Sequence, residues 1–322
     1  MVKFGTGGWR AIIGEEFTKE NIQKLALALC LKIKAEHVED QEIVIGYDRR
    51  FLSKEAAIWA CQIFGKQGIK VLFVDRSSPT PLIMFYVMKH ELPYGLMVTA
   101  SHNPAIYNGI KVFTKGGRDA DEHQTAQIEQ YLVQAEKIYE KDDSEEGQMP
   151  PHSYLDLVKS GMVVEMNPMN EYLDNIISMI NIDAIRERDL RIAIDPMYGV
   201  SLTALCTILS IARCTVETIN AQHDTLFGGK VPAPTEDTLR NLQNYVLDRY
   251  CDIGIATDGD ADRLGVIDDK GHYLHANTIL GMLYYYLLKY KGWRGPAVRN
   301  ISTTHVLDRV AESFGQKCYE VP

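Results

Sequence analysis

A serine, a histidine and a lysine lie close together where a predicted strand ends. The apolar run 96–99 (LMVT) leads into the polar segment ASHNP, which contains Ser101 and His102, and Lys111 follows in the segment NGIK. Active-site side chains in open α/β sheets gather at the carboxyl ends of strands, and a serine nucleophile needs a base or a metal beside it. Ser101 is therefore a candidate nucleophile, with His102 and Lys111 as candidates to move its proton or balance its charge. A strand-ending turn capped by Ser101 is the alternative interpretation.

Three aspartates alternate in the segment DGDADR (258–263), directly after the apolar run CDIGIAT. Asp258, Asp260 and Asp262 would repel one another in a tight loop unless a cation neutralised them, and several hard oxygen ligands suit Mg²⁺. An EF-hand loop does not fit, because Arg263 stands where that loop needs glycine and a strand precedes the segment. An aspartyl nucleophile of a phosphatase and a solvated acidic turn stay open as alternatives.

A glycine-rich segment near the N-terminus, GTGGWR (5–10), could hold a phosphate group. Glycines let backbone N–H groups approach a phosphate, and an arginine offers it a fork of donors. Thr6 and Arg10 are the candidate contacts, although a plain glycine-rich turn explains the segment equally well. A second basic pair, Arg49 and Arg50, follows a predicted strand and is expected to be solvated.

Alternating helices and strands must position these segments. Apolar periodicity predicts helices at 19–34, 54–67, 123–141, around 170–180, 200–212 and 276–290. Short apolar runs predict strands at 42–47, 70–74, 96–99, 190–195, 251–257 and 264–267, the last turning into a hairpin at 268–271. Strands separated by helices of this length favour crossover connections, so we expect an α/β fold with mixed, mainly parallel sheets.

The 322 residues are long for one domain, and the charged, Pro- and Gly-bearing segment 141–153 reads as a linker. We expect one α/β domain over residues 1–145, a linker over 146–168 and a second α/β domain over 169–293. Residues 294–322 hold only one strand, one helix and the start of another strand. A stub of that size cannot bury its own core, so it reads as the beginning of a third domain.

Composition narrows the classes of partner and compartment. The net charge of −9 argues against a nucleic acid or an anionic membrane as partner. The first residues contain no apolar signal segment, and the most apolar stretches, 25–33 and 279–288, are too short to span a bilayer. Six cysteines without a C-x-x-C pair favour a reducing cytoplasm. Nothing in the sequence specifies an oligomeric state.

Taken together, the motifs resemble those of the α-D-phosphohexomutase family, which includes phosphoglucomutase and phosphomannomutase. TASHNP is similar to the phosphoserine loop of that family, DGDADR to its metal loop, and TGGWR to the N-terminal loop near the phosphoserine. The segment FGG (227–229) with Pro232 and Pro234, and the segment ISTTH (301–305), also look like family segments. The similarity covers essentially the whole chain.

The resemblance implies consecutive similar α/β/α domains and a specific reaction. Phosphorylated Ser101 would give its phosphoryl group to O6 of a hexose 1-phosphate. The hexose 1,6-bisphosphate would then reorient, and Ser101 would take the group back from O1. Glucose is the favoured hexose and mannose the next. A Mg-dependent phosphatase using Asp258 and a non-catalytic module that binds sugar phosphates are the alternative functions.

The resemblance also implies roles for individual residues. Mg²⁺ would bind an oxygen of Ser101 together with the three aspartates, and Arg10 and Arg263 would hold phosphoryl oxygens. His102 and Lys111 are assigned jointly to proton transfer or to balancing local charge. Two family motifs do not appear, namely the third-domain loop that contacts sugar hydroxyls and the fourth-domain loop that grips the distal phosphate. We therefore expect the 322 residues to stop inside a third domain and to lack normal turnover.

Overall fold

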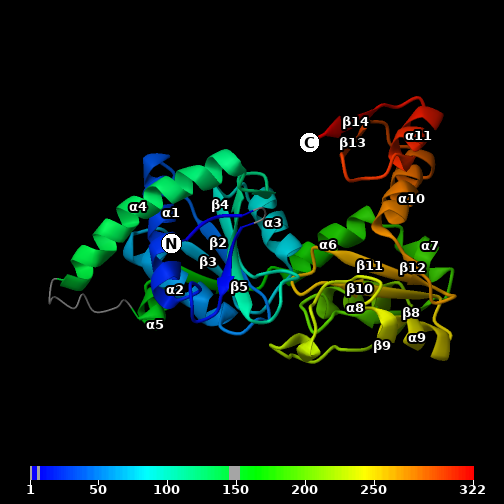
Figure 1. The fold of residues 1–322 in the computed structure, drawn as a ribbon, viewed down its shortest axis with the longest axis horizontal. Coiled ribbons are helices and arrows are strands. Elements are labelled where there is room, and N and C mark those ends of the chain that lie inside the picture. The colour runs from blue at the N-terminus through cyan, green and yellow to red at the C-terminus, as the bar shows by residue number, and fades with distance from the viewer. Residues whose placement is uncertain (1, 6–7, 145–152) are drawn as a thin grey trace.

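Two α/β units lie side by side, and a smaller third unit stands on a helix that leaves the second (Figure 1). The structure is a computed structural model, and it describes residues 2–5, 8–144 and 153–322. None of the helices within these ranges is long and apolar enough to cross a membrane.

The first unit is built on a mixed sheet of seven strands in the order β1-β5-β4-β2-β3-β7, with β6 paired to β5. The strands β2, β3, β4 and β7 run parallel, whereas β5 is antiparallel to β4, β1 and β6. The bounds are β1 (Trp9–Ile12), β2 (Ile43–Tyr47), β3 (Val71–Val74), β4 (Tyr94–Val98), β5 (Tyr107–Thr114), β6 (Arg118–Asp119) and β7 (Val163–Met166). The central strands are continuous apolar runs because helices cover both faces of the sheet.

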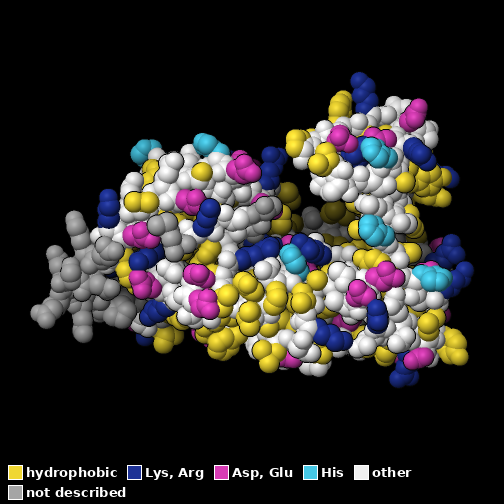
Figure 2. Space-filling view, in the orientation of Figure 1, with side chains coloured by type: hydrophobic (Ala, Val, Ile, Leu, Met, Phe, Trp, Pro, Cys, Tyr) yellow, Lys and Arg dark blue, Asp and Glu magenta, His cyan; other side chains and the backbone are white. Residues whose placement is uncertain are grey.

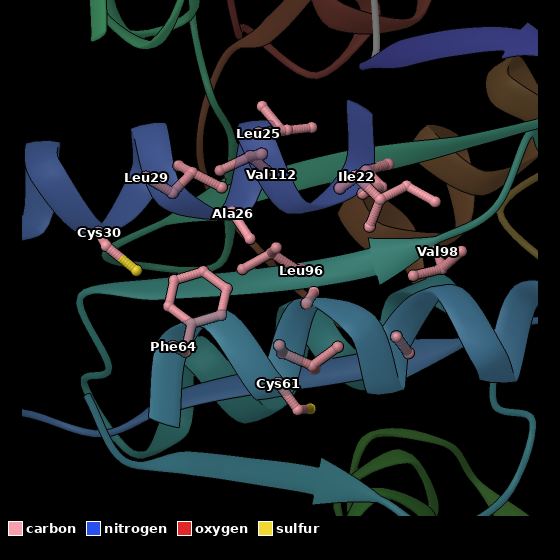
Figure 3. Packing of buried hydrophobic residues seen from close by; sticks show 14 of the residues in the cluster. Ile22, Leu25, Ala26, Leu29, Cys30, Cys61, Phe64, Leu96, Val98 and Val112 are labelled. Carbon is pink, nitrogen blue, oxygen red and sulfur yellow. The ribbon is translucent and has the colours of Figure 1, made fainter. Parts of the chain in front are cut away.

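Four helices of this unit pack together on one face of the sheet, and they are α1 (Lys19–Ala35), α2 (Ser53–Lys66), α4 (Glu122–Ser144) and α5 (Tyr154–Lys159). Leu25 and Leu29 of α1 lie with Phe64 of α2 against Leu96 of β4 (Figure 3). Helix α3 (Thr80–Lys89) covers the other face, where its Ile83 packs in a second cluster.

The second unit is a smaller mixed sheet in the order β12-β11-β10-β8-β9. Its strands β8, β9 and β10 are parallel, and β10, β11 and β12 form an antiparallel meander. The strands are β8 (Arg191–Asp195), β9 (Thr215–Thr218), β10 (Ile253–Thr257), β11 (Leu264–Asp268) and β12 (Tyr273–Leu274). The helices are α6 (Met169–Met179), α7 (Ile182–Arg186), α8 (Leu202–Ile211) and α9 (Arg240–Asp248), with a short 3-10 turn η1 (Phe227–Gly229).

The third unit begins after helix α10 (Ala276–Lys289). It consists of two parallel strands, β13 (Ala297–Asn300) and β14 (Cys318–Val321), connected through helix α11 (Val306–Ser313). Leu307 and Ala311 on α11 are buried, whereas Val298 on β13 and Tyr319 on β14 are exposed.

The α/β class with mixed sheets is confirmed. Part of the range expected as a linker is nevertheless folded: α5 and β7 lie within 146–168, and β7 pairs with β3 in the first sheet. The strand is short and its middle residues are exposed, so it lacks the apolar run that marks the central strands. The core of the expected linker, residues 145–152, lies outside the described residues. The other domain boundaries stay predictions.

Candidate active site

Ser101 occupies a tight turn that follows β4. Its backbone is left-handed, with φ +50°, and the residue is only 1% exposed. The Ser101 N–H donates to Thr99 Oγ1 at 2.8 Å, and that hydroxyl donates to Asp48 Oδ2 at 2.6 Å. The conformation, which is uncommon for a residue other than glycine, is therefore supported by a chain of buried hydrogen bonds.

Arg50 holds the main chain of the same turn. Its buried guanidinium donates to four backbone carbonyls, those of Ser101 and Asn103 at 2.6 Å and those of Pro104 and Tyr107 at 3.0 Å. It also lies over the ring of Phe227 from the second unit, at 4.8 Å from the centroid. The expectation that Arg50 is solvated was wrong, because the carbonyls of the turn converge on its planar fork of donors.

Arg49 also departs from that expectation. It is partly buried and contacts the second unit, where its Nη1 donates to the carbonyls of Ala221 at 3.2 Å and Tyr198 at 3.4 Å. The backbone carbonyl of Arg49 lies 3.0 Å from Nε2 of His223. Arg50 therefore holds the serine turn, whereas Arg49 contacts the second unit at the junction.

The acidic segment is the loop that leaves β10. Asp258 and Asp260 are fully buried and Asp262 is exposed, yet one oxygen from each can be chosen so that all three lie within 4.8 Å. The loop is closed by Asp258 Oδ1, which accepts the N–H groups of Asp262 at 3.0 Å and Arg263 at 3.1 Å. Because the three aspartates stand at every second position of this loop, their carboxylates converge on one point.

The acidic loop meets the serine turn across the junction of the units. Ser101 Oγ donates to Asp258 Oδ2 at 2.7 Å and lies 3.5 Å from Asp262 Oδ1. Lys111, buried on β5, donates to Asp262 Oδ2 at 2.5 Å and to Asp260 Oδ2 at 2.8 Å. Figure 2 shows Lys and Arg side chains gathering where the two larger units meet.

The candidate phosphate contacts lie around this junction. His102 Nδ1 is 3.3 Å from Ser101 Oγ, and Arg10 on β1 donates from Nη1 to Asn103 Oδ1 at 3.0 Å. The Nε atom of Arg10 is buried and has no hydrogen-bond partner within the described ranges, so it could bind a further acceptor. Arg263 is exposed beside the acidic loop, and Thr6 lies outside the described residues.

Comparison with known proteins decides the family. Residues 1–139 match the family model described as "Phosphoglucomutase/phosphomannomutase, alpha/beta/alpha domain I", and residues 170–271 match the corresponding domain II. The chain belongs to the phosphoglucomutase/phosphomannomutase family. The two matches contain Ser101 and the acidic loop respectively.

Relatives within the family align with most of this chain. The "Phosphoglucomutase/phosphomannomutase" of Thermococcus kodakarensis is 29% identical over 317 residues, which are 98% of this chain and 65% of the relative. A protein of Methanobrevibacter smithii assigned as a phosphoglucosamine mutase is 31% identical over 281 residues, 87% of this chain and 58% of the relative. The chain therefore spans less than two thirds of the length of these curated relatives. A crystal structure assigned as a phosphomannomutase of Thermus thermophilus superimposes with a TM-score of 0.85 at 27% identity, covering 100% of this chain and 69% of the other.

In this member of the family, burial and crowding set the charges of the acidic loop. Burial, followed by the nearby carboxylates of Asp260 and Asp262, raises the pKa of Asp258 to about 8. Burial alone would also raise the pKa of Asp260, but the Lys111 ammonium and the hydrogen bonds outweigh it and hold that pKa below its usual value. Burial would lower the pKa of Lys111, yet its two carboxylate partners raise it. The crowding therefore favours the protonated form of Asp258 at neutral pH, whereas Asp260 keeps its negative charge beside Lys111.

The surroundings of His102 favour its neutral form. Burial lowers the pKa of His102, and the positive charges of Arg263 and Arg10 lower it further. A neutral imidazole 3.3 Å from the serine hydroxyl can accept a proton.

Two functional contacts were not predicted from the sequence of this family member. Arg50 was interpreted as a surface residue, and Thr80 was not singled out at all. Thr80 donates from Oγ1 to Asp260 Oδ2 at 2.6 Å and from its backbone N–H to the Asp260 carbonyl at 2.9 Å. Prolines on both sides of Thr80 signal a helix start, but they do not reveal what the hydroxyl contacts.

Proposed function

We propose that the chain carries the phosphoryl-transfer centre of a phosphohexomutase, which interconverts hexose 1-phosphate and hexose 6-phosphate through a phosphate on Ser101. The observation that carries the proposal is the 2.7 Å contact between Ser101 Oγ and Asp258 of the acidic loop. It places the only serine of the TASHNP motif directly against a cluster of three carboxylates from the other unit. Phosphoryl transfer needs a nucleophile and a means to neutralise phosphate charge in one place.

The acidic loop fits a divalent cation. Asp260 Oδ1 is buried and accepts no hydrogen bond from any residue that the structure describes, although a buried carboxylate oxygen ordinarily has a partner. Together with oxygens of Asp258 and Asp262 it offers the hard ligands that Mg²⁺ prefers. Asp258, Asp260, Asp262 and an oxygen on Ser101 would hold the ion. When bound, Mg²⁺ supplies charge stabilisation for the transferring phosphoryl group.

In the proposed reaction, residues of the chain supply the nucleophile and the proton transfer for both halves. The bond between phosphorus and Ser101 Oγ breaks as a bond from phosphorus to O6 of hexose 1-phosphate forms. The O6 proton passes through His102 to Ser101 Oγ, which becomes a free hydroxyl, while the Lys111 ammonium balances charge. The resulting hexose 1,6-bisphosphate turns round, and Ser101 takes the phosphoryl group from O1. In this second transfer the proton of the Ser101 hydroxyl passes to O1, so the phosphoserine is restored. Arg10 and Arg263 hold phosphoryl oxygens during both steps.

A phosphatase that uses Asp258 as its nucleophile is less consistent with the geometry. Both oxygens of Asp258 already accept hydrogen bonds, one from Ser101 and the other from the backbone of the loop. A carboxylate in that position cannot approach a phosphorus atom in line without breaking the loop. Ser101 is the better placed nucleophile of the two.

The substrate class follows from the family and its named relatives. Curated relatives are named for glucose, mannose and glucosamine phosphates, so the proposal is a hexose phosphate, with glucose favoured and mannose next. A hexose 1,6-bisphosphate would serve as both intermediate and activator.

Transfer of a phosphoryl group from glucose 1,6-bisphosphate to dephosphorylated protein tests the proposal. In the presence of Mg²⁺, peptide mapping should find the group on Ser101, and Ser101→Ala should acquire none. Ser313→Ala, an exposed serine on α11, is the matched control and should be phosphorylated as wild type is. Continuous release of inorganic phosphate without a labelled serine would point to the phosphatase instead. Ligand binding without any transfer would point to a binding module.

A further inference from the structure

The two oxygens of the Asp260 carboxylate lie in different environments. Oδ2 accepts one hydrogen bond from Thr80 Oγ1 at 2.6 Å and another from Lys111 Nζ at 2.8 Å. Oδ1 accepts none from the residues that the structure covers, although it is buried. Both donors belong to the first unit, whereas Asp260 belongs to the second. The carboxylate is therefore anchored by one oxygen from across the junction.

Thr80 donates two hydrogen bonds to Asp260. Its backbone N–H donates to the Asp260 carbonyl at 2.9 Å, and its hydroxyl donates to the Asp260 side chain. Thr80 is the first residue of α3, so its N–H has no acceptor within the helix and is available to the loop. Thr80 is 1% exposed and Asp260 is fully buried, so water does not compete for either bond.

The contacts of Thr80 and Lys111 with Asp260 have different effects on its carboxylate. Lys111 is shared between Asp260 and Asp262, so its ammonium balances charge between two carboxylates. The Thr80 hydroxyl has one proton, and giving it to Oδ2 fixes the rotation of the Asp260 carboxylate about its last bond. With Oδ2 anchored in this way, Oδ1 is left without a hydrogen-bond donor among the described residues.

We propose that Thr80 is a positioning residue for the divalent cation, which it serves from the opposite unit by holding Asp260 so that Oδ1 is free to coordinate. This inference rests on the proposed function, in which the three aspartates bind Mg²⁺. Residues that orient metal ligands without touching the metal commonly contribute about 10- to 100-fold to metal affinity. The cation then binds tightly only while the two units are docked.

Titration calorimetry with Mg²⁺ on the 322-residue protein tests the role of Thr80. The samples are compared at the same phosphorylation state of Ser101, which intact mass spectrometry verifies. Thr80→Val removes the hydroxyl and keeps the shape, and it should weaken Mg²⁺ affinity by about tenfold. Thr80→Ser keeps the hydroxyl and should bind Mg²⁺ as wild type does. Ser78→Ala is the matched control, because it removes a buried hydroxyl of the same segment that donates to the Arg76 carbonyl.

The outcomes separate this inference from the proposed function. Equal Mg²⁺ affinity in wild type and Thr80→Val would overturn the role of Thr80 and leave the three-aspartate site standing. Loss of affinity in Thr80→Ser as severe as in Thr80→Val would also overturn it, because the hydroxyl would not be the cause. Absence of Mg²⁺ binding in wild type would overturn both. If Thr80→Val does not fold, Thr80→Ala removes the same hydroxyl without adding bulk and takes its place.

Discussion

Ser101 holds a left-handed backbone conformation that costs a residue other than glycine about 1–3 kcal/mol. The cost is offset by contacts to the main chain of the turn, above all the four carbonyls gathered by the Arg50 guanidinium. The ion pair of Arg50 with buried Asp48, at 3.4 Å, adds to that support. The hydroxyl of the proposed nucleophile is therefore placed by residues that do not contact it.

Arg50→Met should lower the free energy of unfolding by about 3–5 kcal/mol, because it leaves the buried Asp48 carboxylate without its charge partner. It should also reduce the phosphoryl group acquired by Ser101, since the turn loses its anchor. Urea denaturation measures the first effect and intact mass the second. Arg188→Met, at an exposed arginine, should change neither quantity. Similar losses in the two variants would contradict the role of Arg50.

Asp260→Asn should weaken the rise in melting temperature that Mg²⁺ produces. The substitution keeps the shape of the side chain but removes one of the three charges that attract the ion, and a ligand stabilises the folded state in proportion to its binding. Asp237→Asn, at an exposed aspartate, should leave the response to Mg²⁺ unchanged. A full response in Asp260→Asn would exclude the acidic loop as the cation site.

The sequence predicts the site residues that share a motif and misses those that act across the chain. Asp258, Asp260 and Asp262 were recognisable because their alternation is local. Thr80 lies 180 positions from its partner Asp260, and Arg50 lies 51 positions from Ser101. A single sequence has no local signal for such pairs, so only the folded chain reveals them.

At the scale of elements, strand β5 determines where Lys111 lies, yet it was not predicted. It sits between β4 and β1, antiparallel to both, and its residues are largely buried. The dipeptide Asn108-Gly109 inside it carries the signal of a turn, which obscures the strand pattern. The regular helices α1, α2 and α4 and the parallel strands β2 and β3 were predicted because their apolar periodicity is uninterrupted.

Gly109 permits β1 to approach β5 closely. A Cβ atom at this position would collide with the Trp9 carbonyl oxygen and would lie 3.0 Å from the Thr99 carbonyl oxygen. Gly109→Ala should therefore destabilise the protein by about 1–3 kcal/mol in urea denaturation, because the backbone of β1 must move. Gly5→Ala is the comparison, since its Cβ would meet only the Gly8 carbonyl oxygen at 3.9 Å. An unchanged unfolding midpoint for Gly109→Ala would contradict this packing.

At the scale of the whole molecule, the candidate active site exists only where the two larger units meet. Ser101 and Asp258 are 157 positions apart and belong to different sheets. The sequence indicated both units and both motifs, and family resemblance linked the motifs to one reaction. The docking of the two units depends on contacts such as that of Arg49 with the Ala221 carbonyl. No pattern in the sequence predicts such a contact.

Binding of Mg²⁺ in the second unit should slow amide exchange in the first. The Thr80 N–H donates to the Asp260 carbonyl, so an ion that stabilises the acidic loop also protects the start of α3. Hydrogen exchange of peptides covering Thr80 and the loop should slow together when Mg²⁺ is added. A peptide covering α7 serves as control, since it lies in the same unit as the loop and its Arg186 contacts the far end of α8, at the Ile211 carbonyl. Protection confined to the second unit would contradict coupling between the units.

Intact mass spectrometry of the purified protein, prepared without phosphatase treatment, tests the central claim most directly. Wild type should carry one phosphoryl group on at least part of the molecules, and Ser101→Ala should carry none. Incubation with Mg²⁺ and glucose 6-phosphate should remove the group from wild type and produce glucose 1,6-bisphosphate rather than inorganic phosphate. A phosphoryl group that persists in Ser101→Ala, or release of inorganic phosphate in place of the bisphosphate, would contradict a phosphohexomutase centre at Ser101.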